Sequence, residues 1–267
     1  METTLELKHV TKRFSGLVAV NDLSIQVERG CIHSLVGPNG SGKSTTISMI
    51  NGMLPLTDGE IRFNNQTISN LSTHEIARCG IGRTFQNIKV FGTMTVLENV
   101  MVGGHALNRH SGGLIKYLLN VKGTNEEERM IRERAESVLE FIGMKDLMHQ
   151  QVRNLAYGRQ KMTELGRALM TQPQLMLLDE PAAGLNPSER AELTDMLCKV
   201  HDSGVGLFLV EHNMDIVMTI SHRITVINFG AKIAEGTPDE VKNDDEVIRA
   251  YLGSKYKKTA QQETGLC

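Results

Sequence analysis

The residues best suited to chemistry form one short segment, Gly37-Pro-Asn-Gly-Ser-Gly-Lys-Ser-Thr45. It follows the pattern of a phosphate-binding loop, in which a glycine and four further residues precede Gly-Lys-Ser. The glycines allow successive backbone N–H groups to turn toward phosphate oxygens, and the helix that follows adds the positive end of its dipole. Lys43 would bridge the outer phosphates and Ser44 would ligate magnesium. We therefore predict nucleotide contacts from Gly37, Pro38, Asn39, Gly40, Ser41, Gly42, Lys43, Ser44 and Thr45.

A pair of carboxylates, Asp179 and Glu180, follows the apolar run Leu175–Leu178. Beside a phosphate loop, Asp179 would hold magnesium and Glu180 would polarise a water for attack on the γ-phosphate. Taken alone, the pair fits an acidic cap of the next element equally well. The phosphate loop upstream favours the catalytic interpretation.

Three apolar runs have the length of buried strands: Cys31–Val36, Leu175–Leu178 and Gly206–Val210. The first leads into the phosphate loop, the second into Asp179, and the third into Glu211 and His212. In an open α/β sheet, ligands bind at the carboxyl ends of the parallel strands. The pattern therefore predicts an α/β fold with one site at these strand ends.

Other stretches predict a second β layer and a helical insertion. Leu5, Leu7 and His9 alternate with polar residues, which is typical of a half-exposed antiparallel strand, and Leu23, Ile25 and Val27 do the same. Apolar residues recur at helical spacing over much of Thr93–Leu169. Within that insertion, Gly103–Thr124 predicts only a loop with one short helix.

Three further segments complete the expected architecture. Lys43–Asn51 predicts a helix directly after the phosphate loop, and Ile224–Ile227 with Lys232–Ala234 predicts a hairpin. From Ser254 onward the lysine-rich sequence has no apolar pattern, so we expect a disordered tail.

Composition excludes several classes of protein. With 40% apolar and 22% charged residues the chain resembles an ordinary folded protein. A net charge of -2, 4% aromatic residues and no tryptophan argue against a nucleic-acid partner. The four cysteines lie far apart, which disfavours a zinc site or a disulfide framework. Because there is no signal-peptide core and no run of about 18 apolar residues, we expect a cytoplasmic protein that reaches a membrane only through a partner.

Residues 154–170 resemble the signature segment of the ATP-binding cassette (ABC) family. Asn-Leu-Ala-Tyr-Gly-Arg-Gln160 matches a Leu-Ser-Gly-Gly-Gln type of motif and lies between a phosphate loop and a strand ending in Asp-Glu, as in that family. The resemblance extends from about Leu5 to Gly253. It implies a P-loop NTPase with a RecA-like mixed sheet core, an antiparallel β subdomain and a helical insertion. We accordingly expect an ATP-binding domain at residues 1–253, a helical subdomain at about 93–169 and a tail at 254–267.

Three more positions match family residues of known role. Phe14 corresponds to an aromatic that stacks on adenine, Gln86 to a glutamine that touches magnesium and senses the membrane partner, and His212 to a histidine that contacts the γ-phosphate. Taken singly, these side chains also fit a core position, a loop amide and a structural histidine. Their joint order favours the functional roles. The resemblance thus implies Glu180, His212 and Gln86 as catalytic residues and Ser44, Gln86 and Asp179 as magnesium ligands.

In the ABC family the signature of one subunit contacts ATP held by another, so the resemblance implies a head-to-tail pair. The positions concerned are Leu155, Ala156, Tyr157, Gly158 and Gln160. Ala156 replaces the family serine, which removes a hydroxyl contact worth about 1.5–3 kcal/mol. Tyr157 replaces a glycine, which leaves the Gly158 N–H and the helix dipole to contact the phosphate. We expect slower hydrolysis, not its loss.

Several segments resemble one branch of the family, the larger ATP-binding subunit of branched-chain amino acid importers. They are Leu-Ala-Tyr-Gly158, Ala-Ala-Gly-Leu-Asn186-Pro, the long insertion after Arg-Thr-Phe-Gln86, and Val-Ile-Arg-Ala-Tyr251-Leu-Gly. Importers of related amino acids, urea and other amides share much of this pattern. The resemblance implies ATP, Mg²⁺, transmembrane permease subunits, a second ATPase subunit that is identical or non-identical, and indirectly a periplasmic solute-binding protein. It places the chain peripherally on the cytoplasmic face of the inner membrane.

Two alternatives stay open at this point. One is the ATPase of lipopolysaccharide export, against which the insertion at Gly103–Thr124 argues. The other is a non-transport ABC ATPase, such as a DNA-repair or translation factor. Those proteins usually carry coiled-coil inserts or tandem cassettes, and this sequence has neither.

Overall fold

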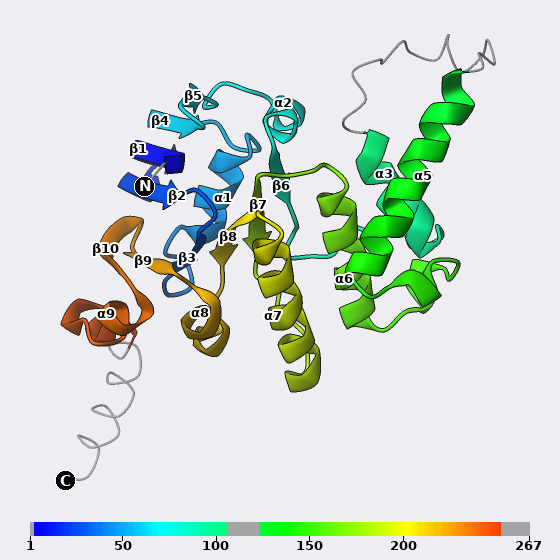
Figure 1. The fold of residues 1–267 in the computed structure, drawn as a ribbon. Coiled ribbons are helices and arrows are strands. Elements are labelled where there is room, and N and C mark those ends of the chain that lie inside the picture. Colours follow the sequence, from blue (N-terminus) through cyan, green and yellow to red (C-terminus); the bar gives the residue numbers. More distant parts are fainter. Residues whose placement is uncertain (1–2, 106–122, 252–267) are drawn as a thin grey trace.

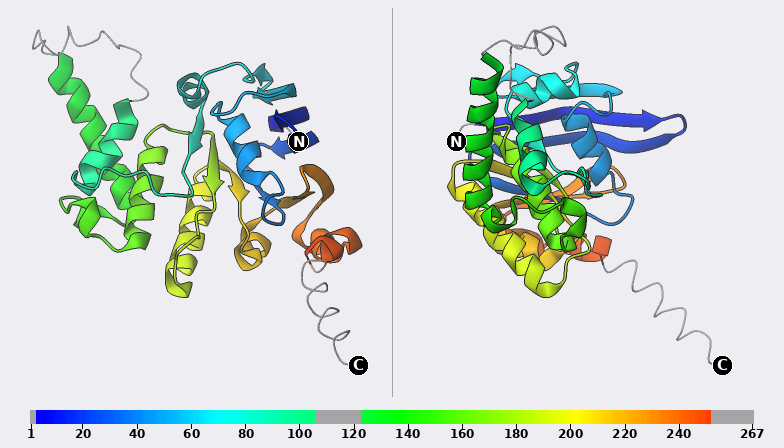
Figure 2. Two further views of the ribbon diagram at one scale, coloured as in Figure 1. Left: turned by 180° about the vertical axis from the view of Figure 1, so that it is seen from behind. Right: turned by 90° about the vertical axis from the view of Figure 1, so that its right-hand side faces the viewer.

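Two β-sheets form the centre of the computed structural model, which describes residues 3–105 and 123–251 (Figure 1). The smaller sheet has four strands in the order β2-β1-β4-β5, and the larger has six in the order β10-β9-β3-β8-β7-β6. Helices α3, α5 and α6 lie to one side of both sheets, as Figures 1 and 2 show. The predicted α/β fold is confirmed.

The smaller sheet is antiparallel, as the alternating pattern near the N-terminus predicts. Its strands are β1 (Thr3–Phe14), β2 (Leu17–Glu28), β4 (Asp58–Phe63) and β5 (Gln66–Thr67). The expected alternation is wrong at His9, which is exposed, whereas Val10 is buried with Leu5 and Leu7. The register shifts between Leu7 and Val10, and His9 has a positive φ of 49°. Such a β-bulge interrupts the alternation of side chains between the two faces, and no periodicity rule anticipates it.

The larger sheet contains the three strands predicted from apolar runs. Its strands are β3 (Ile32–Val36), β6 (Ile81–Arg83), β7 (Leu175–Asp179), β8 (Gly206–Val210), β9 (Arg223–Asn228) and β10 (Ala231–Gly236). Strands β6, β7, β8, β3 and β9 pair in parallel, and β10 pairs antiparallel to β9 as the predicted terminal hairpin. Residues in β3, β7 and β8 are all buried, because layers cover both faces of this part of the sheet.

Alternate residues of the central strands pack against different layers. In β7, Leu175 and Leu177 join a core with the smaller sheet and α1 (Lys43–Ile50). Met176 and Leu178 join a second core with α7 (Pro187–Asp202) and α8 (Met214–Ile220). The two-residue period of a strand thus stabilises both layers at once. The helix predicted after the phosphate loop, Lys43–Asn51, is α1.

Between β6 and β7 the larger named elements are helical. They are α3 (Val96–His105), α5 (Gly123–Phe141), the 3₁₀ turns η1 (Lys145–Leu147) and η2 (Val152–Asn154), and α6 (Tyr157–Leu169). Val100, Leu139 and Leu165 share their core. A Cβ on Gly103 would lie 2.1 Å from the Arg167 carbonyl oxygen, so glycine permits the close approach of α3 to α6.

Two short helices, α2 (Thr73–Arg78) and α9 (Pro238–Lys242), complete the named elements. Most of the predicted loop at Gly103–Thr124 lies outside the described residues, as does the tail at 254–267. In the described part of the chain, no helix is long and apolar enough to span a membrane. Cys31, Cys79 and Cys198 are free thiols.

Candidate functional site

The phosphate loop connects β3 to α1, and its tight path requires glycine at defined positions. Gly42, the N-cap of α1, has φ 104°. A Cβ there would lie 2.5 Å from the Ala19 carbonyl oxygen on β2. Gly40 also has a left-handed φ, of 80°. Because larger side chains disfavour such backbone conformations, these glycines let the loop close over the start of α1.

Lys43 is folded into the loop that carries it. Its Nζ donates hydrogen bonds to the carbonyl oxygens of Gly37 at 2.8 Å and Pro38 at 3.0 Å. The side chain is buried, and burial lowers the pKa of Lys43, an effect that Glu180 and Asp179 oppose. A phosphate group would supply the negative charge that favours the protonated amine.

Asp179 ends β7 as a buried carboxylate. Its Oδ2 accepts a hydrogen bond from Arg83 Nη2 on β6 at 3.2 Å. Oδ1 is buried and has no hydrogen-bond partner among the described residues. Burial raises the pKa of Asp179, and the nearby Arg83 guanidinium lowers it in part. An unpaired, buried carboxylate oxygen is suited to a hard cation such as Mg²⁺ or to a water in its shell.

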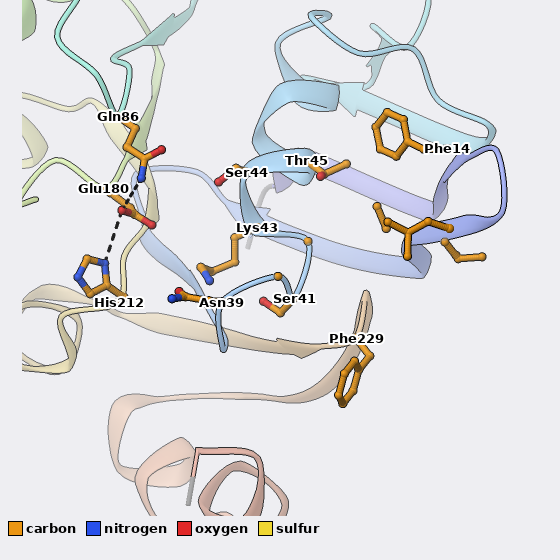
Figure 3. Close-up of a pocket in the computed structure, with 15 residues that line it drawn as sticks. Phe14, Asn39, Ser41, Lys43, Ser44, Thr45, Gln86, Glu180, His212 and Phe229 are labelled. Carbon is orange, nitrogen blue, oxygen red and sulfur yellow. Dashed lines mark hydrogen bonds and ion pairs between the residues drawn. The ribbon is translucent and has the colours of Figure 1, made fainter. Parts of the chain in front are cut away.

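The Glu180 side chain lies beside two side chains from the segments that follow neighbouring strands. Its Oε2 accepts a hydrogen bond from Gln86 Nε2 at 2.8 Å and lies 3.7 Å from His212 Nδ1 (Figure 3). Gln86 follows β6, Glu180 follows β7 and His212 follows β8, and these strands are neighbours in the sheet. Glu180 has φ 47°, a strained conformation for a residue with a side chain. Such strain is frequent where a side chain must be held in a functional position.

Glu211 is a site residue to which the sequence analysis assigned no role. It is fully buried, and its Oε1 accepts the Ala182 N–H at 2.9 Å. Its Oε2 accepts the N–H groups of His212 at 2.9 Å and Asn213 at 3.0 Å. The carboxylate therefore joins the loop after β7 to the loop after β8. The only signal in the sequence was its position beside His212 at a strand end.

A cavity of about 680 Å³ extends from the phosphate loop to the side chains of Gln86, Glu180 and His212 (Figure 3). Of the predicted residues, it is lined by Phe14, Asn39, Gly40, Ser41, Gly42, Lys43, Ser44, Thr45, Gln86, Glu180 and His212. Phe14 lies at the end away from Gln86 and His212. Phe229, which the sequence analysis did not single out, also lines the cavity. The cavity thus has an aromatic ring at one end and the phosphate loop with polar side chains at the other, which suits a ligand with an aromatic group and a phosphate chain.

The predicted signature residues lie elsewhere. Leu155, Ala156, Tyr157, Gly158 and Gln160 do not line this cavity. Ala156 is the N-cap of α6, and with Gly158 it lines a separate cavity of about 150 Å³ beside α7. Gln160 Nε2 donates to the Leu155 carbonyl oxygen at 2.9 Å. The phosphate loop and the predicted signature segment of one chain therefore line different cavities.

Comparison with known proteins agrees with this geometry. Residues 20–183, more than half of the chain, match the model of the ABC transporter family. The high-affinity branched-chain amino acid transport ATP-binding protein BraF of Pseudomonas aeruginosa is 40% identical over 93% of this chain and 97% of its own. The corresponding LivG protein of Escherichia coli K12 shows the same identity and coverage.

The chain belongs to the ABC transporter family. A crystal structure of a nucleotide-free ATP-binding cassette from an ABC transporter superposes with a TM-score of 0.81 at 34% identity, covering 93% of this chain and 98% of that one. The ADP conformation of MJ1267, also an ATP-binding cassette, has the same TM-score at 32% identity, covering 95% and 100%. The present ABC subunit is thus a nucleotide-binding ATPase. Residues 231–257 also match the branched-chain amino acid ATP-binding cassette transporter model.

In this ABC subunit, Tyr157 of the signature packs against Gly184 in the loop after β7. A Cβ on Gly184 would lie 3.0 Å from Tyr157 Cε1, and Gly184 has φ 77°. Lys161 Nζ lies 5.4 Å from the Tyr157 ring centroid. The tyrosine that replaces the usual signature glycine is therefore accommodated by a glycine opposite and stabilised by a cation–π contact.

Proposed function

We propose that this ABC subunit hydrolyses ATP to drive an importer of branched-chain or related amino acids, with urea and other amides as further candidate solutes. Relatives that are 40% identical are named as ATP-binding proteins of high-affinity branched-chain amino acid transport. The match of residues 231–257 to the model of the branched-chain amino acid class supports the same solute.

The observation that carries the catalytic assignment is the convergence of Gln86 and His212 on Glu180. Glu180 would accept a proton from a water whose oxygen attacks the γ-phosphorus. The bond from that phosphorus to the bridging oxygen breaks, which yields ADP and inorganic phosphate. Gln86 orients the Glu180 carboxylate through its 2.8 Å hydrogen bond. The exposed imidazole of His212 would contact the γ-phosphate.

The phosphate loop would bind the rest of the triphosphate. The backbone N–H groups of the loop and the amine of Lys43 would exchange their present contacts for phosphate oxygens. Ser44, exposed in the cavity, and the unpaired Oδ1 of Asp179 fit a magnesium site, with Gln86 as the third residue. When bound, Mg²⁺ neutralises negative charge on the phosphates.

The adenine would bind at the Phe14 end of the cavity. Phe14 is 41% exposed, so its ring face is available for stacking. Lys12 Nζ lies 5.0 Å from the same ring, which holds the ring in place. The ring and the phosphate loop would then bind opposite ends of the nucleotide.

We infer that two such subunits act head to tail. The N-terminus of α6, with Leu155, Ala156, Tyr157, Gly158 and Gln160, does not line its own chain's cavity, so it is available to ATP held by a partner. The second ATPase is identical or non-identical. The pair would dock on transmembrane permease subunits at the cytoplasmic face of the inner membrane and receive solute indirectly from a periplasmic binding protein.

Uptake of radiolabelled leucine, isoleucine and valine tests this function in cells that lack the gene. We expect the wild-type chain to restore uptake and Glu180→Gln, expressed at the same level, to fail. Unlabelled urea and other amides serve as competitors that report the range of solutes. If cells without the gene take up all three amino acids at the normal rate, the solute assignment is wrong, although ATP hydrolysis by the purified chain would stand.

A further inference from the structure

Glu164 is a buried carboxylate in α6, the helix that starts at the signature segment. It lies two turns into the helix, and the residue is only 4% exposed. Burial raises the pKa of Glu164, and the neighbouring groups described next lower it again in part. Because burying a carboxylate costs several kcal/mol when it is poorly paired, its surroundings must supply strong compensation.

The compensation comes from the loop that carries Gln86. Glu164 Oε1 accepts a hydrogen bond from the backbone N–H of Lys89 at 2.9 Å. Phe85, the residue before Gln86, lines the same small cavity as Glu164, and its backbone lowers the pKa of this carboxylate. Arg167, one turn further along α6, places Nη2 3.6 Å from Oε1 and balances part of the charge. Glu164 thus hydrogen-bonds the loop after Gln86 and lies beside it before Gln86.

Other contacts hold the two ends of this loop: the Thr84 N–H donates to the Leu177 carbonyl oxygen at 3.0 Å, and the Phe91 N–H donates to Asn99 Oδ1 at 2.8 Å. No helix or strand is assigned between Thr84 and Phe91, and Gln86 and Lys89 are exposed. Gln86 still makes its 2.8 Å hydrogen bond to Glu180. An exposed loop samples many conformations, so a fixed hydrogen bond from its middle residue requires anchored ends.

The same face of α6 also holds the backbone at Glu180. Lys161, three residues before Glu164, donates from Nζ to the carbonyl oxygens of Pro181 at 2.7 Å and Glu180 at 3.3 Å. Residues three apart lie on one face of a helix. Two neighbouring side chains of α6 therefore contact the two segments that supply Gln86 and Glu180.

We propose that Glu164 is a positioning residue for ATP hydrolysis, which anchors the loop at Lys89 so that Gln86 meets Glu180. It touches neither the cavity around Lys43 nor the nucleotide that would bind there. The proposal rests on the role proposed above for Gln86 in catalysis.

Hydrogen exchange tests the anchor directly. In purified full-length Glu164→Ala, backbone amides in fragments spanning residues 84–91 should exchange faster than in the wild type, because the hydrogen bond from the Lys89 N–H is lost. Fragments from α6 should keep their protection. Glu164→Gln keeps the volume and one acceptor oxygen, so it should show an intermediate effect, and it replaces the alanine variant if that does not fold. Unchanged exchange at 84–91 in a folded variant would overturn the proposal.

Steady-state kinetics test the consequence for catalysis. We expect Glu164→Ala to lower kcat about tenfold while the Kd for a non-hydrolysable ATP analogue stays within about twofold of the wild-type value. Because Glu164 acts through Gln86, the double variant with Gln86→Ala should hydrolyse ATP at the rate of Gln86→Ala alone, within about twofold. Glu140→Ala, which removes an exposed partner of Lys145, is the matched control and should leave kcat unchanged.

The double variant separates positioning from a general loss of stability. Effects of Glu164→Ala and Gln86→Ala that multiply would show that Glu164 acts elsewhere, and a full kcat in Glu164→Ala would also overturn the proposal. If Gln86→Ala itself keeps the full kcat, the catalytic role of Gln86 is wrong and the positioning role fails with it. Hydrogen exchange would then still show whether Glu164 anchors the loop.

Discussion

Gln86 Nε2 donates a 2.8 Å hydrogen bond to Glu180 Oε2 across a separation of 94 residues. The contact exists because β6 and β7 are adjacent parallel strands, so the segments that follow them leave the sheet at the same edge. Lys161 holds the Glu180 backbone and Glu211 holds Ala182 two residues later. The segment that carries Glu180, the proposed general base, is therefore held by contacts from several elements.

Replacing Glu180 by glutamine should separate ATP binding from hydrolysis. The amide keeps the shape and an acceptor for Gln86, but it accepts no proton from water. We expect kcat to fall at least about 100-fold, since a positioned general base contributes about 10²–10⁴ to a rate. The Kd for ATP should stay close to the wild-type value, measured by isothermal titration calorimetry. Normal turnover in this variant would show that another group is the base.

The same variant should reveal the oligomeric state that ATP favours. Because we expect Glu180→Gln to bind ATP without hydrolysing it, light scattering with MgATP should show a shift from monomer to dimer. Two copies would then form both sites, as a homodimer requires. A persistent monomer that binds ATP would contradict self-association and point to a non-identical ATPase partner. The variant Lys43→Ala with MgATP serves as the control that should stay monomeric.

Serine at position 156 should change both stability and turnover. Ala156 is the N-cap of α6 and makes no side-chain cap. A serine hydroxyl there would accept a hydrogen bond from a free helix N–H and raise the free energy of unfolding by about 1 kcal/mol. If the same hydroxyl contacts the γ-phosphate of ATP bound by the other subunit of the proposed pair, it should raise kcat up to about tenfold. Urea unfolding and ATPase assays measure the two effects.

A matched change calibrates the capping effect. Thr237 is the N-cap of α9, and its hydroxyl accepts the Glu240 N–H at 3.4 Å. Thr237→Ala should lower the free energy of unfolding by about 1 kcal/mol. If Ala156→Ser stabilises the chain but leaves kcat unchanged, the backbone N–H groups at the start of α6 suffice for phosphate contact.

Gly184→Ala should destabilise the chain for two reasons, the left-handed backbone conformation at this position and the close packing of Tyr157 against it. The φ of 77° costs a residue with a Cβ about 1–2 kcal/mol, and that Cβ would press on Tyr157. Gly204→Ala is the control, since Gly204 has φ 96° but nothing within 4 Å of the added Cβ. Urea unfolding should show a larger loss for Gly184→Ala. In the background of Tyr157→Ala, Gly184→Ala should cost no more stability than Gly204→Ala does. If the losses from Gly184→Ala and Tyr157→Ala simply add, the contact between the new Cβ and the Tyr157 ring is ruled out.

His33 should make stability depend on pH. It is fully buried in β3, its Nε2 lies 2.8 Å from Thr225 Oγ1, and its ring stacks on Phe208. Burial lowers the pKa of His33 to about 4 from 6.5. The unfolded chain therefore binds the proton more readily, so the stabilisation is complete above pH 6.5 and is lost as the pH falls toward 4.

Urea unfolding measures the effect of His33 on stability. Between about pH 7.5 and about pH 5, the wild type should lose about 2 kcal/mol more than His33→Gln. Glutamine places an amide nitrogen near the position of Nε2, so the contact to Thr225 can persist without a titrating ring. Equal losses in the two proteins would mean that His33 does not titrate in this range.

The local features of the site follow from short sequence patterns. Glycine spacing identifies the phosphate loop because only contiguous residues form its turn, and burial of Leu175–Asp179 on both faces gives an apolar run that ends at the carboxylates. These patterns depend on neighbours a few residues away. The order of the motifs along the chain then sufficed to predict the ABC family, which the comparisons confirm.

Contacts between distant segments required the folded chain. Glu164, Lys161 and Glu211 show no distinctive spacing, yet each holds a backbone segment next to Gln86, Glu180 or His212. Likewise, the bulge at His9 arises from pairing with two neighbouring strands, not from local periodicity. A buried carboxylate is stabilised only when strand order brings N–H donors to it, and strand order is a property of long-range pairing that no short pattern encodes.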